Sequence, residues 1–132
     1  MTKEEKELLL KDLCMRLSYG VICYAPDNEY GENGILYSVS PFEKDEPNIW
    51  IEYPTDNILS LFVSEIKPYL RLLPKMTKKE KKEYDKLRMS FYKNAKDASL
   101  VLIDWLNAHH FDHRGLIEKG LAIEAPEGMY KN

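Results

Sequence analysis

The strongest indication of the fold class lies in residues 21–54, VICYAPDNEYGENGILYSVSPFEKDEPNIWIEYP. This segment contains three short runs of β-branched and aromatic residues, at positions 21–24, 35–39 and 49–53. Proline, glycine, asparagine and aspartate separate the runs, and these residue types favour tight turns. Three short strands joined by turns predict an antiparallel meander.

A helix is predicted before this meander, over residues 3–19. Thr2 and Glu5 have the spacing of a capping box, in which each side chain binds the other residue's backbone N–H. Leucines behind the box recur at helical spacing and form one apolar stripe. Gly20 is the expected end, because glycine adopts the left-handed conformation without steric cost.

After the meander the pattern is less decisive. Residues 57–65 fit either a short helix or a strand. Residues 67–73 alternate in the manner of a strand, but Pro68 removes one backbone donor. Since proline is tolerated mainly at sheet edges, an edge strand is expected here.

The later part of the chain is predicted to be helical. Thr77 and Glu80 form a second capping box and predict a helix over residues 78–93. A further helix follows, with Asp97 or Ser99 as its N-cap.

Beyond these helices, Asp112 is expected to cap a short turn that ends at Gly120, followed by an extended tail. The whole chain of 132 residues has the size of one domain. We therefore predict a single α+β domain. Residues 1–74 supply a helix and a small antiparallel sheet of three to five strands, and residues 75–132 supply two helices and the tail.

Composition limits the functional classes. The net charge of −3 argues against general binding to nucleic acid, because phosphate affinity is built from accumulated lysine and arginine. Cys14 and Cys23 match no zinc or redox spacing, so free thiols in a reducing cytoplasm are expected. No cofactor motif, signal peptide or membrane-spanning run is visible, and a cytoplasmic protein without membrane contact is predicted.

The three histidines are the first candidates for chemistry. His109 and His113 have the four-residue spacing of the HExxH zinc site, but His110 stands where that site has its catalytic glutamate. Asp112 is the nearest third ligand. The alternative is a helix C-terminus at which imidazoles and Arg114 lie near the negative end of the helix dipole. That structural interpretation is favoured.

A lysine-rich helix is the second candidate. Glu80, Glu83 and Asp85 interrupt its basic residues, so a solvated helix surface explains the pattern more simply than a phosphate-binding element. The basic residues are Lys75, Lys78, Lys79, Lys81, Lys82, Lys86 and Arg88.

Three pieces of the chain carry a family resemblance: the N-terminal helix with residues 19–21, residues 66–71 with the Lys/Glu-rich helix that follows, and residues 103–130. The last piece has the pattern WLNxxHFDxRGLIxxGLAxEAPEGMY. The chain resembles short uncharacterised proteins encoded by gut anaerobic bacteria and by their phages or mobile elements. The resemblance implies a phage or mobile-element context and no particular activity. In that family the positions of His109 and His113 often hold other residues, which weakens the zinc hypothesis.

A non-enzymatic protein-interaction module that binds a host or phage protein is therefore the leading hypothesis. The alternatives are a metal-dependent hydrolase that uses His109, Asp112 and His113, and a nucleic-acid accessory protein that uses the lysine-rich helix. The candidate contact residues are Trp50, Tyr53, Tyr69, His110, Asp112 and Arg114.

Overall fold

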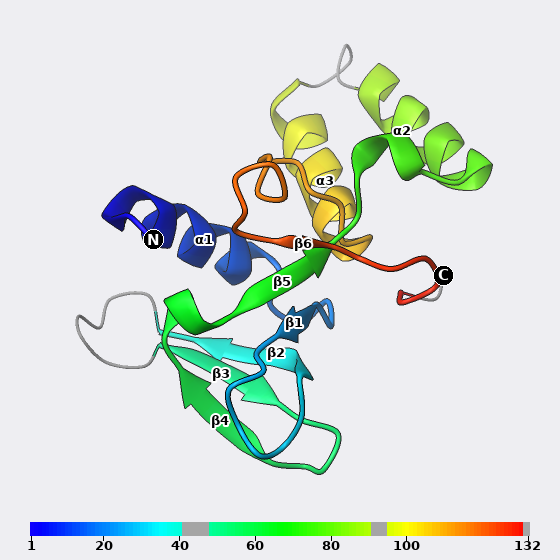
Figure 1. Cartoon of the computed structure of the whole chain (residues 1–132). Helices are drawn as coiled ribbons and strands as arrows, with labels where there is room; N and C mark the ends of the chain where they lie inside the picture. The colour runs from blue at the N-terminus through cyan, green and yellow to red at the C-terminus, as the bar shows by residue number, and fades with distance from the viewer. Residues whose placement is uncertain (41–47, 91–94, 131–132) are drawn as a thin grey trace.

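A computed structural model describes residues 1–40, 48–90 and 95–130 and has the predicted α+β architecture (Figure 1). An N-terminal helix precedes the strands, and two further helices follow most of them. The elements are α1 (Lys3–Met15), β1 (Ile22–Tyr24), β2 (Asn33–Val39), β3 (Ile49–Glu52), β4 (Ile58–Leu61), the 3-10 turn η1 (Val63–Glu65), β5 (Lys67–Leu70), the 3-10 turn η2 (Leu73–Lys75), α2 (Lys78–Ser90), α3 (Ala95–Ala108) and β6 (Ile123–Glu124).

The strands form one six-stranded mixed sheet in the order β4-β3-β2-β1-β5-β6. The prediction of three to five antiparallel strands is wrong, because β6 adds to the sheet and runs parallel to β5. The prediction of an edge strand at Pro68 is also wrong, since β5 lies between β1 and β6. Pro68 is opposite Cys23 of β1, and the pairing with β6 begins only at Tyr69. The proline therefore lies beside the β6 ladder and not within it.

The first helix begins as predicted and ends earlier. Thr2 and Glu5 form the capping box, with the Glu5 N–H 3.1 Å from the Thr2 hydroxyl oxygen. The helix ends at Met15, short of the predicted residue 19. Ser18 has a positive φ of 72°, which is incompatible with continued helix.

The ambiguous segment 57–65 is a strand followed by a 3-10 turn. The predicted N-cap at Asp97 or Ser99 is wrong, because α3 already begins at Ala95. The second capping box is present: the Glu80 N–H donates to the Thr77 hydroxyl over 3.1 Å. α2 is described only to Ser90, so the predicted end at residue 93 lies outside the described residues.

One face of the sheet packs against α1. Leu9 and Leu13 of the helix are fully buried in the core cluster, together with Leu36, Ile49 and Ile51 of the sheet. Because side chains alternate along a strand, the neighbours of these residues point to the opposite face. One face of the sheet is therefore buried against α1, and the neighbours of these residues lie on the opposite face.

The later helices lie beyond the end of β5 (Figure 1). Trp105 of α3 packs near Tyr84 of α2, with ring centroids 6.0 Å apart. The Trp105 ring also lies 5.8 Å from the ring of Phe111, which follows α3. None of the helices in the described ranges is long and apolar enough to cross a bilayer.

Candidate functional site

The segment that follows α3 is built into the body of the protein. His110 adopts a positive φ of 64°, and its carbonyl accepts a 2.8 Å bond from the Arg71 N–H. The Asp112 N–H returns a 2.8 Å bond to the Arg71 carbonyl. The His110 ring stacks on Tyr130 with centroids 3.7 Å apart. Burial, followed by the charge of Arg16, lowers the pKa of His110 to about 4.

Asp112 has the capping role predicted for it. Its two carboxylate oxygens accept 3.0 Å bonds from the backbone N–H groups of Leu116 and Ile117. The turn ends at Gly120, whose N–H donates to the Ile117 carbonyl. The carboxylate is thus occupied by the chain's own backbone.

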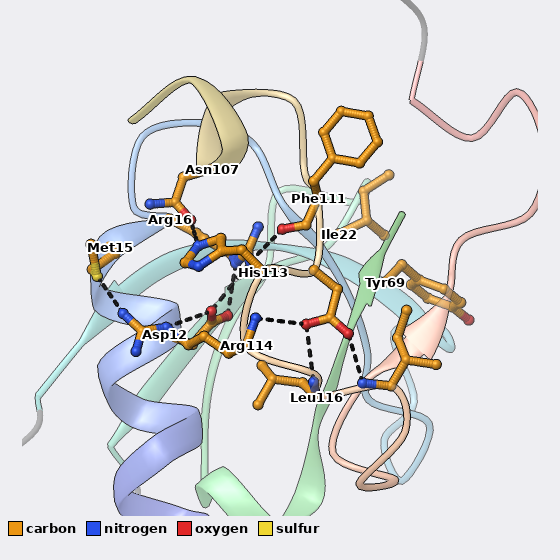
Figure 2. Close-up of polar contacts among 12 residues, drawn as sticks. Asp12, Met15, Arg16, Ile22, Tyr69, Asn107, Phe111, His113, Arg114 and Leu116 are labelled. Carbon is orange, nitrogen blue, oxygen red and sulfur yellow. Dashed lines mark hydrogen bonds and ion pairs between the residues drawn. The ribbon is translucent and has the colours of Figure 1, made fainter. Parts of the chain in front are cut away.

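A buried charged cluster ties this segment to α1 (Figure 2). Asp12 and Arg16 are both fully buried, with 2.7 Å between Arg16 Nε and Asp12 Oδ2. Arg16 Nη2 also donates to the Phe111 carbonyl over 2.8 Å, and Arg114 Nε lies 3.3 Å from Asp12 Oδ1. Desolvating such a pair is costly, so each partner depends on the other for its burial.

Sequence reasoning missed this cluster. Asp12 and Arg16 have an i,i+4 spacing, which on a helix usually means an exposed ion pair. The available signal was helical spacing, because Asp12 stands three residues after Leu9 and Arg16 three residues after Leu13 of the apolar stripe. Arg114, one of the candidate binding residues, belongs to the cluster and has a side chain 21% exposed.

The Tyr130 hydroxyl bridges β1 and β5 of the sheet. The Tyr130 hydroxyl accepts a 2.8 Å bond from the Ile22 N–H of β1 and donates a 2.7 Å bond to the Tyr69 carbonyl of β5. Burial raises the pKa of this hydroxyl, which favours its protonated, donating form. Tyr130 thus connects two strands at the point where they separate.

The histidines of the zinc hypothesis lie in separate contacts. The His109 ring stacks on the Trp105 ring, with centroids 4.3 Å apart. Nδ1 of His109 lies 2.9 Å from the carbonyl oxygen of Trp105. His113 places Nε2 2.8 Å from Asn107 Oδ1, and burial lowers its pKa. Among the described residues, no group of three or more His, Cys, Asp or Glu side chains is placed to hold a metal ion. The arrangement does not bring His109, Asp112 and His113 to one ion.

Most of the other candidate contact residues also face inward. Tyr53 is 1% exposed and its hydroxyl donates to the Ala25 carbonyl over 3.1 Å. Tyr69 is 9% exposed and donates to Asn33 Oδ1 over 3.0 Å. Trp50, by contrast, is only partly buried and lies on the sheet face opposite α1.

That opposite face is the main apolar surface of the sheet, and we name it the open sheet face. The register aligns Ile35 with Glu52 and Glu52 with Ile58 across three neighbouring strands. Ile35, Tyr37 and Ile58 are 46%, 57% and 43% exposed. A solvated sheet face normally carries polar residues, whereas this one is largely aromatic and aliphatic. The open sheet face consists of Ile35, Tyr37, Trp50, Glu52 and Ile58, and the small polar residues Ser38 and Ser60 lie opposite Trp50 in the register.

A groove of about 400 Å³ adjoins the open sheet face. Ile22, Ile35 and Met129 contribute apolar walls, and the charged residues in its lining are Glu52 and Asp56. The groove is therefore apolar with an acidic border.

A second groove, of about 480 Å³, lies where β5 and β6 end. Lys75 and Glu124 form an exposed ion pair 2.5 Å apart at its border. Arg71, also in the lining, binds Glu80 over 2.7 Å. These charges are already paired, and Glu127 is the further charged residue in the lining.

Comparisons with protein-family models, curated proteins and solved structures found no match to this chain. The resemblance to short proteins of gut bacteria and phages stays a prediction.

Proposed function

We propose that this chain is a non-enzymatic protein-interaction module that binds its partner through the open sheet face. The observation that carries the proposal is the exposure of Ile35, Tyr37 and Ile58, which are 46%, 57% and 43% exposed on the sheet face opposite α1. Contiguous apolar surface of this kind marks interaction sites. Tyr37 and Trp50 are also residue types enriched at protein interfaces.

The border of this face indicates the chemistry of the partner. Glu52 and Asp56 beside the apolar groove favour a partner with an apolar side chain flanked by lysine or arginine. The same carboxylates repel phosphate groups. Among the described strands β4 pairs only with β3, so β4 is an edge strand. The edge of a sheet can pair with an extended segment of another polypeptide. A protein partner fits these features better than a nucleic acid.

The biological setting follows from the resemblance and belongs to the same proposal. The partner is a host or phage protein, encountered in the cytoplasm. Five of the predicted contact residues are not part of the proposed binding surface, because they bind the chain's own backbone and side chains. These residues are Tyr53, Tyr69, His110, Asp112 and Arg114. Trp50 remains in the proposed contact.

The test compares two matched double variants in quantitative capture from host-cell extract. Tyr37→Ser/Ile58→Ser alters the open sheet face, and Met89→Ser/Leu100→Ser removes apolar side chains that are 71% and 62% exposed on α2 and α3. We expect one protein to be retained by the unaltered chain and by the helix variant but lost from the face variant.

Equal retention of every captured protein by both variants would refute the proposal. Size-exclusion chromatography over a range of concentrations addresses a second copy as the partner. Self-association that disappears in the Tyr37→Ser/Ile58→Ser variant would replace the proposed host or phage partner.

A further inference from the structure

Most of the acidic and basic side chains of α2 point in different directions. Glu80 is 4% exposed and binds Arg71 through two contacts of 2.7 Å. Glu83 accepts a 3.1 Å bond from the Trp105 indole N–H. Two of the three carboxylates that interrupt the lysine run, those of Glu80 and Glu83, therefore contact the rest of the protein.

The lysines of α2 point the other way. Lys78, Lys82 and Lys86 follow one another at four-residue intervals and form one row along the helix, and Lys79 and Lys81 flank this row. All of these side chains are exposed, and the exposed acid among them is Asp85. The α2 basic face consists of Lys78, Lys79, Lys81, Lys82 and Lys86.

We propose that the α2 basic face binds the phosphate backbone of nucleic acid without reading its sequence. Backbone binding needs accumulated positive charge and little else. From Lys78 to Lys86 the row spans about 12 Å at 1.5 Å per residue. A 12 Å length of duplex axis carries about seven phosphates over its two strands, at one per about 1.7 Å, which is more than the five lysines of the face.

The composition of the face disfavours the two other polyanionic partners. Protein interfaces are depleted in lysine and enriched in aromatic residues, whereas this side of α2 carries five lysines beside Asp85 and Met89 and no aromatic residue. Membrane-surface helices insert an apolar side, but Tyr84 on the apolar side of α2 faces α3, with its ring 6.0 Å from that of Trp105. Nucleic acid is the polyanion that this arrangement fits.

The net charge of the chain argues against general binding to nucleic acid, whereas the α2 basic face favours such binding locally. The net charge of −3 describes the whole chain, while binding depends on the local field of one surface. The α2 basic face is separate from the open sheet face, so this proposal and the protein-binding proposal fail or succeed independently.

The test uses the full chain and fluorescence anisotropy with a 20-base-pair duplex of mixed sequence at 25 to 150 mM salt. We expect the logarithm of the association constant to fall with the logarithm of salt concentration at a slope of about −4, as for four or five phosphate contacts. The variant Lys79→Gln/Lys81→Gln/Lys82→Gln should bind at least about tenfold more weakly at low salt. Its slope should be shallower by about 2 to 3.

The matched control is Lys3→Gln/Lys6→Gln/Lys11→Gln, which changes the net charge equally at exposed lysines of α1. This control should alter affinity by less than about twofold. Thermal unfolding checks that both triple variants are folded. If the α2 triple is unfolded, Lys82→Gln alone should make the slope shallower by about 1.

Poly-glutamate and vesicles containing phosphatidylserine serve as the competing probes. Absence of duplex binding at 25 mM salt, or an equal loss in both triple variants, would overturn the proposal. Tighter binding to poly-glutamate or to the vesicles than to the duplex would also overturn it. Preference for the duplex together with the loss in the α2 triple alone would support it.

Discussion

Replacing Tyr130 with phenylalanine removes one oxygen atom from the junction between β1 and β5. Cys23 lies opposite Pro68 in the antiparallel register, which places Ile22 opposite Tyr69. At this next position the Tyr130 hydroxyl bridges the Ile22 N–H and the Tyr69 carbonyl, over 2.8 and 2.7 Å. The variant keeps the ring and its shape but leaves two backbone groups without this partner.

The expected cost is about 2 kcal/mol in the free energy of unfolding. A buried backbone group without a partner costs about 1–3 kcal/mol. The lower part of the possible total applies, because the junction is only partly buried and water can reach it. The ring of phenylalanine can still stack on His110, so the loss reports on the hydroxyl.

Urea unfolding at pH 7 measures this cost, with Tyr37→Phe as the control. Tyr37 is 57% exposed, and its variant should change stability by less than about 0.5 kcal/mol. Amide hydrogen exchange adds a local readout: the Ile22 N–H should exchange about 30-fold faster, since 1.4 kcal/mol corresponds to a factor of about ten. Equal stability of the two variants, or unchanged exchange at Ile22, would refute the bridging role.

Three further substitutions test buried groups and close packing. Asp12→Asn should cost about 3–5 kcal/mol in urea unfolding, because it leaves the fully buried Arg16 without its carboxylate. The double variant Asp12→Leu/Arg16→Met should cost less than the two single changes together, and additive losses would contradict the coupling. Burial lowers the pKa of His110 from 6.5 to about 4, so its contribution to stability is complete above pH 6.5 and is lost as the pH falls toward 4, by at most about 3 kcal/mol. His110→Asn should flatten this part of a pH titration of stability, and an unchanged profile would argue against the assignment. Gly34→Ala places a Cβ 2.9 Å from the Glu52 backbone oxygen and should cost about 2 kcal/mol in urea unfolding, whereas a variant as stable as the unaltered chain would show that β2 and β3 separate freely.

The local elements of the fold were predictable because their signals are local. The capping boxes at Thr2 and Thr77 and the β-branched runs of the meander act within a few residues. The position of β5 depended on a partner 54 residues later, Ile123, in a strand of two residues that has no visible periodicity. Without β6, Pro68 correctly indicates an edge, and this long-range pairing is what made the prediction wrong.

The surface was harder to predict than the fold. Tyr53 and Tyr69 were expected to be accessible aromatics, but each tyrosine satisfies its hydroxyl internally and can therefore be buried. Ile35, Leu36 and Tyr37 are apolar in succession, so the sequence does not reveal which of them face outward. Only the register with β3 and the packing of α1 distinguish the buried Leu36 from its two exposed neighbours.

Site-specific photo-crosslinking in the host cell tests whether another protein contacts the open sheet face. A photoreactive phenylalanine derivative replaces Tyr37 on the open sheet face or, as the control, Leu100 on α3, which is 62% exposed. We expect one dominant adduct with another protein at Tyr37 and no such adduct at Leu100. The absence of an adduct at Tyr37, the same adducts at both positions, or an adduct between two copies of this chain would contradict it.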